Sequence, residues 1–346
     1  MTTTLTFPEA LVHIAETGGG KRRVSAELLD PLRFISVRQC ETAYPLDLIQ
    51  LVLDVKGPLW VCDEIARDED ENYVQKKLRN DLLGYLPASA FASKTILDFG
   101  CGSGASTVIL GRMFPDARIA GVELDPNLLR LARARAEFHR LGNATFHRSP
   151  DAKSLPDELA GFDFAILSAV YEHLLPDERR TVLPEIWARL KPGGTLFIDQ
   201  TPYRYFPVEA HATGLPLINY LPDRWAHKMA VKFSRRVASG ETWEGLLRKG
   251  IRGGSEREIQ KILRGKSSNH PPILLEPGQN NLRDRIDLWY SNMDVRRYPR
   301  VARMVKYFAK TVQWLTGAVV VHSLSLAIRK PADPDLPPCK GGPRGI

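Results

Sequence analysis

The sequence lacks the features that mark secreted, membrane-spanning and cysteine-ligated zinc proteins. Its 346 residues include only four cysteines, Cys40, Cys62, Cys101 and Cys339, without a Cys-x-x-Cys pair, so neither a zinc site nor a disulfide framework is expected. The longest apolar stretch, residues 317–328, is interrupted at His322 and falls short of the roughly 20 residues that span a bilayer. The first residues show no basic segment followed by an apolar one, so we expect no secretory signal and a cytoplasmic protein.

Composition and charge are those of a globular protein with one unusual segment. Hydrophobic residues make up 43% of the chain and charged residues 25%, which excludes a disordered chain. The net charge is +8, and residues 201–300 alone hold 18 lysines and arginines against 10 acidic residues. All of the imbalance therefore lies in this segment, which suits an anionic or amphiphilic acceptor or a nucleic acid.

From residue 95 the chain alternates β-branched runs with helical stretches, which predicts a parallel sheet with helices on both faces. The expected strands are residues 95–99, 118–122, 144–147, 163–167 and 195–199, and the expected helices are 104–114, 126–141 and 176–190. Asp125 and Pro126 form a typical helix start. Pro184 should kink or shorten the third helix.

The other segments are assigned around this core. Residues 1–90 are predicted to form a helical N-terminal cap, 91–200 the core, and 201–300 a long basic insertion after the fifth strand that covers an acceptor. Residues 301–330 should supply a helix and the closing strand, and the proline-rich residues 331–346 a disordered tail. The apolar face of that helix is expected to pack on the domain with its basic residues outward, although the same pattern fits peripheral contact with an anionic membrane.

A glycine-rich turn joins the first core strand to its helix. Gly100, Gly102 and Gly104 permit positive φ and a close backbone approach, and the helix N-terminus that follows offers free N–H groups. The turn therefore predicts a bound ligand, although glycines also occur in such turns for steric reasons alone. Glu123 ends the next strand, where a carboxylate can accept both ribose hydroxyls. A dinucleotide fold is disfavoured because Ala105 replaces the third glycine of G-x-G-x-x-G.

The pattern acid-x-Gly-x-Gly-x-Gly resembles that of class I S-adenosylmethionine-dependent methyltransferases. Similar segments follow in the family's order at residues 150–156, 161–164, 171–174 and 190–194. The resemblance implies a Rossmann-like α/β sheet and S-adenosyl-L-methionine as cofactor. It also implies that Glu123 holds the ribose, Asp151 and the Ala152 amide the adenine, and that Ser168 lies near the methionine. The full set of implied cofactor residues is Asp98, Gly100, Cys101, Gly102, Gly104, Glu123, Leu124, Asp151, Ala152 and Ser168.

Three residues are candidates for catalysis. His173 follows the fourth strand and could serve as general base for a hydroxyl acceptor, while the alternative is a scaffold histidine. His211 and Tyr203 are the other candidates, since both follow the fifth strand. Glu172, His173 and His211 partly resemble the ligands of metal-dependent terminal-ribose RNA methyltransferases, but Ala169 replaces the first glutamate of that motif, so no metal site is predicted.

We therefore expect an S-adenosylmethionine-dependent methyltransferase that methylates an oxygen of a small or amphiphilic molecule. A nucleic-acid methyltransferase would also explain the local basic charge, but no RNA-binding motif supports it. A third alternative is a protein that binds S-adenosylmethionine without catalysis.

Overall fold

The structure is a computed structural model that describes residues 2–30, 35–265, 271–293 and 299–332. The predicted disordered tail therefore lies, except for its first two residues, outside the described residues. Among those described, no helix has the length and apolarity needed to cross a membrane.

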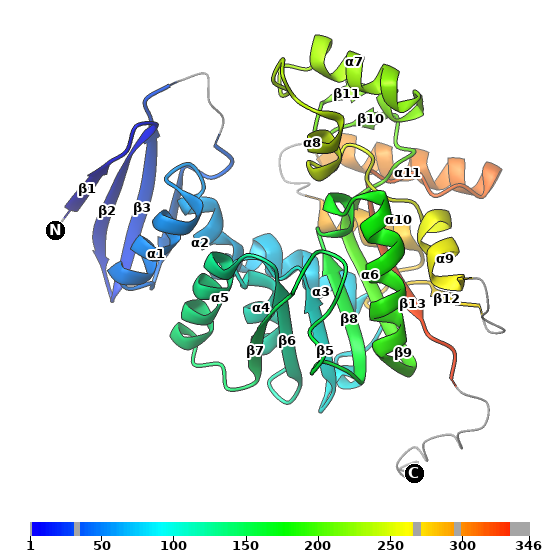
Figure 1. The fold of residues 1–346 in the computed structure, drawn as a ribbon, viewed down its shortest axis with the longest axis horizontal. Helices are drawn as coiled ribbons and strands as arrows, with labels where there is room; N and C mark the ends of the chain where they lie inside the picture. The colour runs from blue at the N-terminus through cyan, green and yellow to red at the C-terminus, as the bar shows by residue number, and fades with distance from the viewer. Residues whose placement is uncertain (1, 31–34, 266–270, 294–298, 333–346) are drawn as a thin grey trace.

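The centre of the molecule is a seven-stranded sheet with the order β12-β13-β9-β8-β5-β6-β7 (Figure 1). The predicted strands are β5 (Thr95–Phe99), β6 (Arg118–Glu123), β7 (Ala144–Arg148), β8 (Phe162–Ser168) and β9 (Leu190–Pro202), and they pair in parallel. Strand β13 (Ser323–Arg329) closes the sheet antiparallel to β9 as expected, and β12 (Ile273–Leu275) adds an edge strand. The chain order reverses between β5 and β8, where ligands bind in open α/β sheets.

Helices cover both faces of this sheet, which confirms the predicted α/β architecture. One apolar cluster lies beneath α6 (Pro176–Arg189) and α9 (Glu256–Arg264). The other lies beneath α3 (Lys76–Leu83), α4 (Ala105–Met113) and α10 (Arg285–Asn292). Helix α5 (Pro126–Phe138) begins at Asp125, whose side chain accepts a hydrogen bond from the Asn127 amide as an N-cap. Helix α6 continues through Pro184 to Arg189, so the proline does not shorten it.

The N-terminal segment corrects the prediction of a purely helical cap. Four strands, β1 (Thr2–Thr6), β2 (Ala10–Gly18), β3 (Lys21–Leu28) and β4 (Gln39–Thr42), form an antiparallel sheet there. Alternate side chains of β2 and β3 pack on α1 (Leu46–Lys56) and α2 (Val61–Glu69), the period-two pattern of a half-buried strand. The glycines between β2 and β3 have positive φ and close a hairpin. A π-helical turn, η1 (Glu71–Gln75), leads into α3, so the helical prediction holds beyond residue 45.

The insertion after β9 is a set of short elements with a small core of its own. It contains β10 (Val208–Glu209), β11 (Leu215–Pro216), α7 (Asp223–Phe233) and α8 (Trp243–Arg248), which precede α9, β12 and α10. Ile218, Ala226, Ala230, Leu246 and Ile251 form its buried cluster. In Figure 1, α7 and α8 stand above the carboxyl end of the sheet.

Helix α11 (Pro299–Thr316) turns toward the domain the opposite face from the one that its sequence predicts. The predicted apolar contact face is exposed, with Met304 at 71% and Phe308 at 68% relative exposure. The face toward the domain instead carries Lys306 and Lys310, which form ion pairs with Asp287 of α10 at 2.7 and 2.8 Å. The expectation that the apolar side packs on the domain is therefore wrong, because neighbouring carboxylates on α10 hold the lysines.

Candidate active site

The three glycines of the turn after β5 have different structural roles. All have positive φ, at 72° for Gly100, 55° for Gly102 and 86° for Gly104. A Cβ on Gly104 would lie 2.5 Å from the Cβ of Ala132, and one on Gly100 would lie 2.8 Å from Val170, but one on Gly102 would meet nothing within 4 Å. Two glycines thus allow close packing, whereas Gly102 presents open backbone to a cleft.

Glu123 lies beside this turn at the end of β6. Its Oε2 accepts a hydrogen bond from the Gly102 amide at 3.0 Å, and its Oε1 accepts from the amides of Leu124 and Asp125 at 2.6 and 3.1 Å. The carboxylate is therefore oriented by backbone donors next to the open glycine. Each oxygen retains acceptor capacity for a hydroxyl.

The carboxylate of Asp98 contacts helix α4. Asp98 is buried and accepts hydrogen bonds from the hydroxyls of Ser106 and Thr107 at 2.7 and 2.6 Å. Burial raises its pKa to about 6, although these two donors lower it. The structure thus gives the predicted cofactor residue Asp98 a contact that anchors the first turn of α4.

The remaining predicted cofactor residues divide between the cleft and the loops around it. Gly100, Cys101, Gly102 and Ser168 line the cleft, while Asp98, Gly104, Glu123, Leu124, Asp151 and Ala152 do not. Ser168 donates to Asp199 at 2.6 Å. The exposed Asp151 accepts from the Lys153 amide and the Ser154 hydroxyl of its own loop. Contact between these residues and a cofactor remains a prediction.

The main cleft has a volume of about 1460 Å³ and lies above the carboxyl ends of the central strands. Its walls come from four parts of the chain: the N-terminal helices, the glycine turn, the segments after β8 and β9, and the region of α10 and β13. Lys77 and Asp81 belong to the N-terminal helices, and Gly102 belongs to the glycine turn. His173 follows β8, His211 follows β9, and Trp289 and His322 come from the region of α10 and β13.

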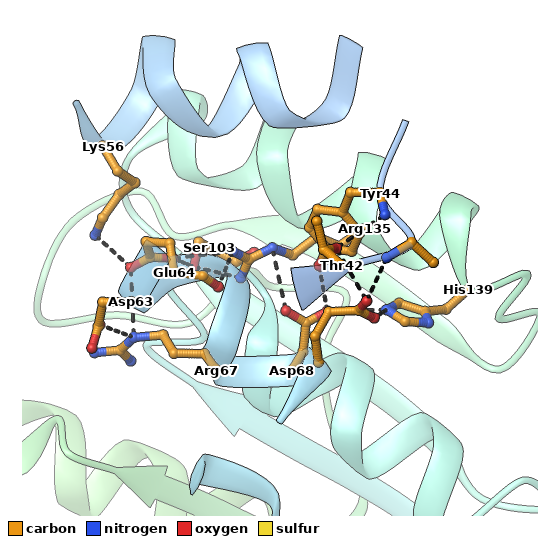
Figure 2. Close-up of polar contacts among 12 residues, drawn as sticks. Thr42, Tyr44, Lys56, Asp63, Glu64, Arg67, Asp68, Ser103, Arg135 and His139 are labelled. Carbon is orange, nitrogen blue, oxygen red and sulfur yellow. Dashed lines mark hydrogen bonds and ion pairs between the residues drawn. The ribbon is translucent and has the colours of Figure 1, made fainter. Parts of the chain in front are cut away.

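A buried ionic network joins the N-terminal segment to the glycine turn (Figure 2). Arg135 of α5 is fully buried, and its guanidinium donates to the carboxylate of Glu64 at 3.2 Å and to the Ser103 hydroxyl at 3.0 Å. Ser103, within the turn, donates to Glu64 at 2.6 Å. Burial raises the pKa of Glu64, but the charges of Arg135, Arg67 and Lys56 together outweigh this effect and hold the pKa at about 2. Glu64 is therefore an anion that fixes the turn.

Two of the three predicted catalytic residues come together with Glu172. Ligand atoms of Glu172, His173 and His211 all lie within 4.8 Å of one another, and the two imidazole centroids are 5.7 Å apart. Burial raises the pKa of Glu172, and burial together with the charge of His173 lowers that of His211. Tyr203, in contrast, lines a second cavity of about 740 Å³ beside α9, so the structure separates it from the two histidines.

Sequence reasoning missed two polar residues of the main cleft, His322 and Asp81. His322 accepts from the Trp289 indole at 2.8 Å, and burial together with the charge of Lys77 lowers its pKa. Asp81 is buried, accepts from Asn292 at 2.7 Å, and has a pKa raised by burial and by Asp199. The sequence did offer a signal for both, namely a polar residue inside an otherwise apolar pattern. His322 interrupts the apolar stretch 317–328, and Asp81 lies within the apolar helical spacing of residues 72–86.

Comparison with known proteins identifies the core. Residues 96–194 match the family described as "Methyltransferase domain". A trans-aconitate 2-methyltransferase of Azoarcus sp. (strain BH72) is 32% identical over 173 residues, which are 50% of this chain and 60% of that protein. The core is a class I S-adenosylmethionine-dependent methyltransferase domain. The cofactor of this methyltransferase domain is S-adenosyl-L-methionine, as the resemblance to the family implied.

Two further proteins are similar to this chain. The demethylmenaquinone methyltransferase of Lactococcus lactis subsp. lactis (strain IL1403) is 28% identical over 202 residues, or 55% of this chain and 77% of that protein. The solved structure of the S-adenosylmethionine-dependent methyltransferase SibL aligns with a TM-score of 0.43 and 13% identity over 82% of this chain and 62% of that one. The chain spans 46–60% of the length of four trans-aconitate 2-methyltransferases that it matches.

Proposed function

We propose that the protein transfers the methyl group of S-adenosylmethionine to an oxygen of a small or amphiphilic anionic acceptor held in the main cleft. The observation that carries the proposal is that the open side of Gly102 faces the same cleft as a set of polar side chains suited to bind an acceptor. A cofactor at the turn and an acceptor beside these side chains would share one enclosed space, which is how such enzymes align reactants.

The residues around the turn fit the cofactor. Gly102 leaves room for backbone contact, and Glu123 is oriented beside it by three amides. S-adenosylmethionine supplies an electrophilic methyl group, which forms a bond to the acceptor oxygen as its bond to sulfur breaks and leaves the electron pair on sulfur. A hydroxyl acceptor must also lose its proton, whereas a carboxylate attacks as the anion. The role of general base predicted for His173 belongs to the hydroxyl case.

Charge in the cleft favours an anionic acceptor. Among the described residues, Lys56 and Arg67 are ion-paired with Glu64, but Lys77 has no such partner. Burial lowers the pKa of the Lys77 amine, and an acceptor carboxylate would stabilise its charged form. The relatives named trans-aconitate 2-methyltransferase, whose name specifies a carboxylate, support this class of acceptor.

The insertion takes part in this proposal through few residues. His211, Trp289, Asn292 and Met293 line the main cleft. Arg235 and Arg236 do not line it, and Arg236 donates to the carbonyl of Ala210 at 2.7 Å. The positive net charge of residues 201–300 suggests arginine contacts to the acceptor, whereas the insertion residues that line the cleft carry histidine, aromatic, amide and apolar side chains. A cytoplasmic location and peripheral membrane contact remain part of the proposal, and the exposed apolar side chains of α7 and α11 support the latter.

Methyl transfer from labelled S-adenosylmethionine to a panel of small carboxylates and hydroxylated amphiphiles tests this function, with products identified by mass spectrometry. The acceptor's KM should rise at least about 10-fold in Lys77→Met, the loss expected for one charged hydrogen bond, while cofactor affinity stays unchanged. Lys232→Met, on the exposed face of α7, is the matched control. Cofactor binding without turnover of any acceptor would favour the non-catalytic alternative, and RNA binding that weakens steeply with salt would favour the nucleic-acid alternative.

A further inference from the structure

Glu172 contains a buried oxygen atom without a hydrogen-bond partner. The residue is fully buried, and its Oε2 accepts from the Thr201 hydroxyl at 3.0 Å. Its Oε1 has no such partner and lies 3.8 Å from Nε2 of His173. A buried carboxylate oxygen left unpaired is costly, so this geometry favours a cation between the carboxylate and the imidazole.

His173 is fixed in the tautomer that a metal ligand requires. Its Nδ1 lies 2.7 Å from the carbonyl oxygen of Arg248, and because a carbonyl only accepts, Nδ1 carries the hydrogen. In the neutral ring, Nε2, which lies 3.8 Å from Oε1 of Glu172, is then the nitrogen with the lone pair that can bind a metal ion. The Arg248 guanidinium is itself held by two hydrogen bonds of 2.6 Å to Glu178 of α6. Such outer contacts orient the histidine ligands of metal sites.

His211 reaches this pair from the insertion because Gly250 leaves space for it. Gly250 has a φ of 85°, and a Cβ there would lie 2.9 Å from Cδ2 of His211 and 3.1 Å from Cγ of Glu172. The His211 amide donates to Glu209 at 2.9 Å, which holds the backbone of this loop. Two segments far apart in sequence thus converge on Glu172.

We infer that Glu172, His173 and His211 bind one divalent first-row transition-metal ion. Two imidazole nitrogens and one carboxylate oxygen form a donor set that suits such ions. Ligand atoms on one ion at about 2.1 Å lie no more than about 4.2 Å apart, so a small rotation of the exposed His211 closes the cluster. Ala169 carries no ligand atom and, like the three ligands, lines the main cleft, which leaves coordination positions open toward it.

The open positions define what the ion would bind. An oxygen of the acceptor, from a carboxylate or a hydroxyl, would complete the coordination from the cleft side. This part of the inference rests on the proposed function, whereas the binding of the ion does not.

A second cluster with similar donor atoms provides a contrast. Asp68, Glu69 and His139 also lie within 4.8 Å of one another. There, however, Oδ2 of Asp68 accepts from the Tyr44 hydroxyl at 2.5 Å, and Oδ1, which also has no hydrogen-bond partner, lies 3.9 Å from Nε of the buried, permanently charged Arg135. The charge of that carboxylate is compensated, so we expect no ion there.

Cobalt binding to the full-length protein tests the site without an activity assay. Chelator-treated protein is titrated with Co²⁺ at neutral pH and followed by visible absorption and calorimetry. We expect one equivalent to bind, and Glu172→Gln, His173→Asn and His211→Asn each to weaken binding by at least about 10-fold. The controls are His139→Asn, at the second cluster, and His227→Asn, on α7, and both should bind as the unsubstituted protein does. Absence of saturable binding, or binding lost only in His139→Asn, would overturn the inference.

Parallel measurements separate this inference from the proposed function. If the demethylated cofactor product binds and methyl transfer proceeds in chelator without any change in the acceptor's KM, coordination of the acceptor by the ion is wrong and the function stands, while the Co²⁺ titration alone decides whether the ion binds. If Co²⁺ binds with the expected variant pattern but no acceptor is methylated, the site stands and the proposed function fails.

Discussion

At the glycine turn, individual side chains either hold the backbone in place or lie next to the space for the ligand. Asp98 and Ser103 belong to the first group, because their polar atoms bond to α4 and to Glu64. Glu123 belongs to both, because it bonds to the Gly102 amide and lies beside the open turn. Substitutions at Asp98 and Glu123 should therefore have different effects.

Glu123→Ala should weaken binding of S-adenosylmethionine by about 1.5–3 kcal/mol, or roughly 10-fold to 150-fold, the range for hydrogen bonds to a charged group. Calorimetric titration measures the effect, and Glu137→Ala, at an exposed position of α5, is the matched control. An unchanged dissociation constant in a folded Glu123→Ala protein would show that the ribose is held elsewhere.

Asp98 should make stability depend on pH in a defined direction. Its pKa is about 6 in the folded protein, above the ordinary value of 3.8, so the folded state retains a proton that the unfolded state releases. The contribution to stability is complete below pH 3.8 and is lost as the pH rises through 6. Relative to Asp98→Asn, the free energy of unfolding should fall by about 2 kcal/mol between pH 4 and pH 7.

Urea unfolding of both proteins across that range measures this difference. A difference between them that stays constant with pH would show that Asp98 does not titrate as its burial requires.

At the scale of the elements, α11 shows how ion pairs can decide which face of an amphipathic helix meets the domain. Ala302 and Ala309 are its buried apolar residues, and Lys306 and Lys310 bond to α10 beside them. The larger apolar side chains consequently face outward.

This orientation predicts that large apolar residues of α11 contribute little to stability. Phe308→Ala should change the free energy of unfolding by no more than about 0.5 kcal/mol, as for other exposed positions. Leu288→Ala, at a fully buried residue of α10, should cost about 2–5 kcal/mol. Urea unfolding of the two variants compares them, and a large loss in Phe308→Ala would mean that the apolar face is covered.

At the scale of the whole molecule, the N-terminal sheet and helices are joined to the methyltransferase domain by one buried charge network. Arg135 provides the link, because it contacts Glu64 of α2 and Ser103 of the glycine turn while Leu131 of the same helix packs into the N-terminal apolar cluster. The N-terminal segment therefore helps to shape the cofactor site.

Arg135→Met should destabilise the protein by about 3–5 kcal/mol, since it removes the only fully buried cation that faces both Glu64 and Asp68 among the described residues. It should also weaken cofactor binding, because the turn loses the donor to Ser103. Arg133 lies two residues earlier on α5 and is exposed, so Arg133→Met should have neither effect. Unfolding by urea and cofactor titration measure both, and a Met variant as stable as the original protein would show that the network is dispensable.

The sequence by itself determined the features that depend on neighbouring residues. The order and approximate positions of β5 to β9, the N-cap at Asp125 and the glycine turn all follow from local patterns of polarity, capping and backbone freedom, although β9 extends well beyond the predicted residues 195–199. These patterns also carried the resemblance to the methyltransferase family. The N-terminal strands were missed although Val12, Ile14, Val24 and Ala26 alternate with polar residues. The apolar spacing typical of a helix begins only near residue 44, and the helical prediction covered the whole of residues 1–90.

Only the tertiary structure decided which distant side chains share a site. It joined His211 to Glu172 and His173, placed Tyr203 in another cavity, and brought Lys77, Asp81 and His322 to one cleft. It also turned the apolar face of α11 outward. These outcomes depend on contacts between segments up to hundreds of residues apart, and on which buried charges find partners, so no local periodicity or spacing specifies them.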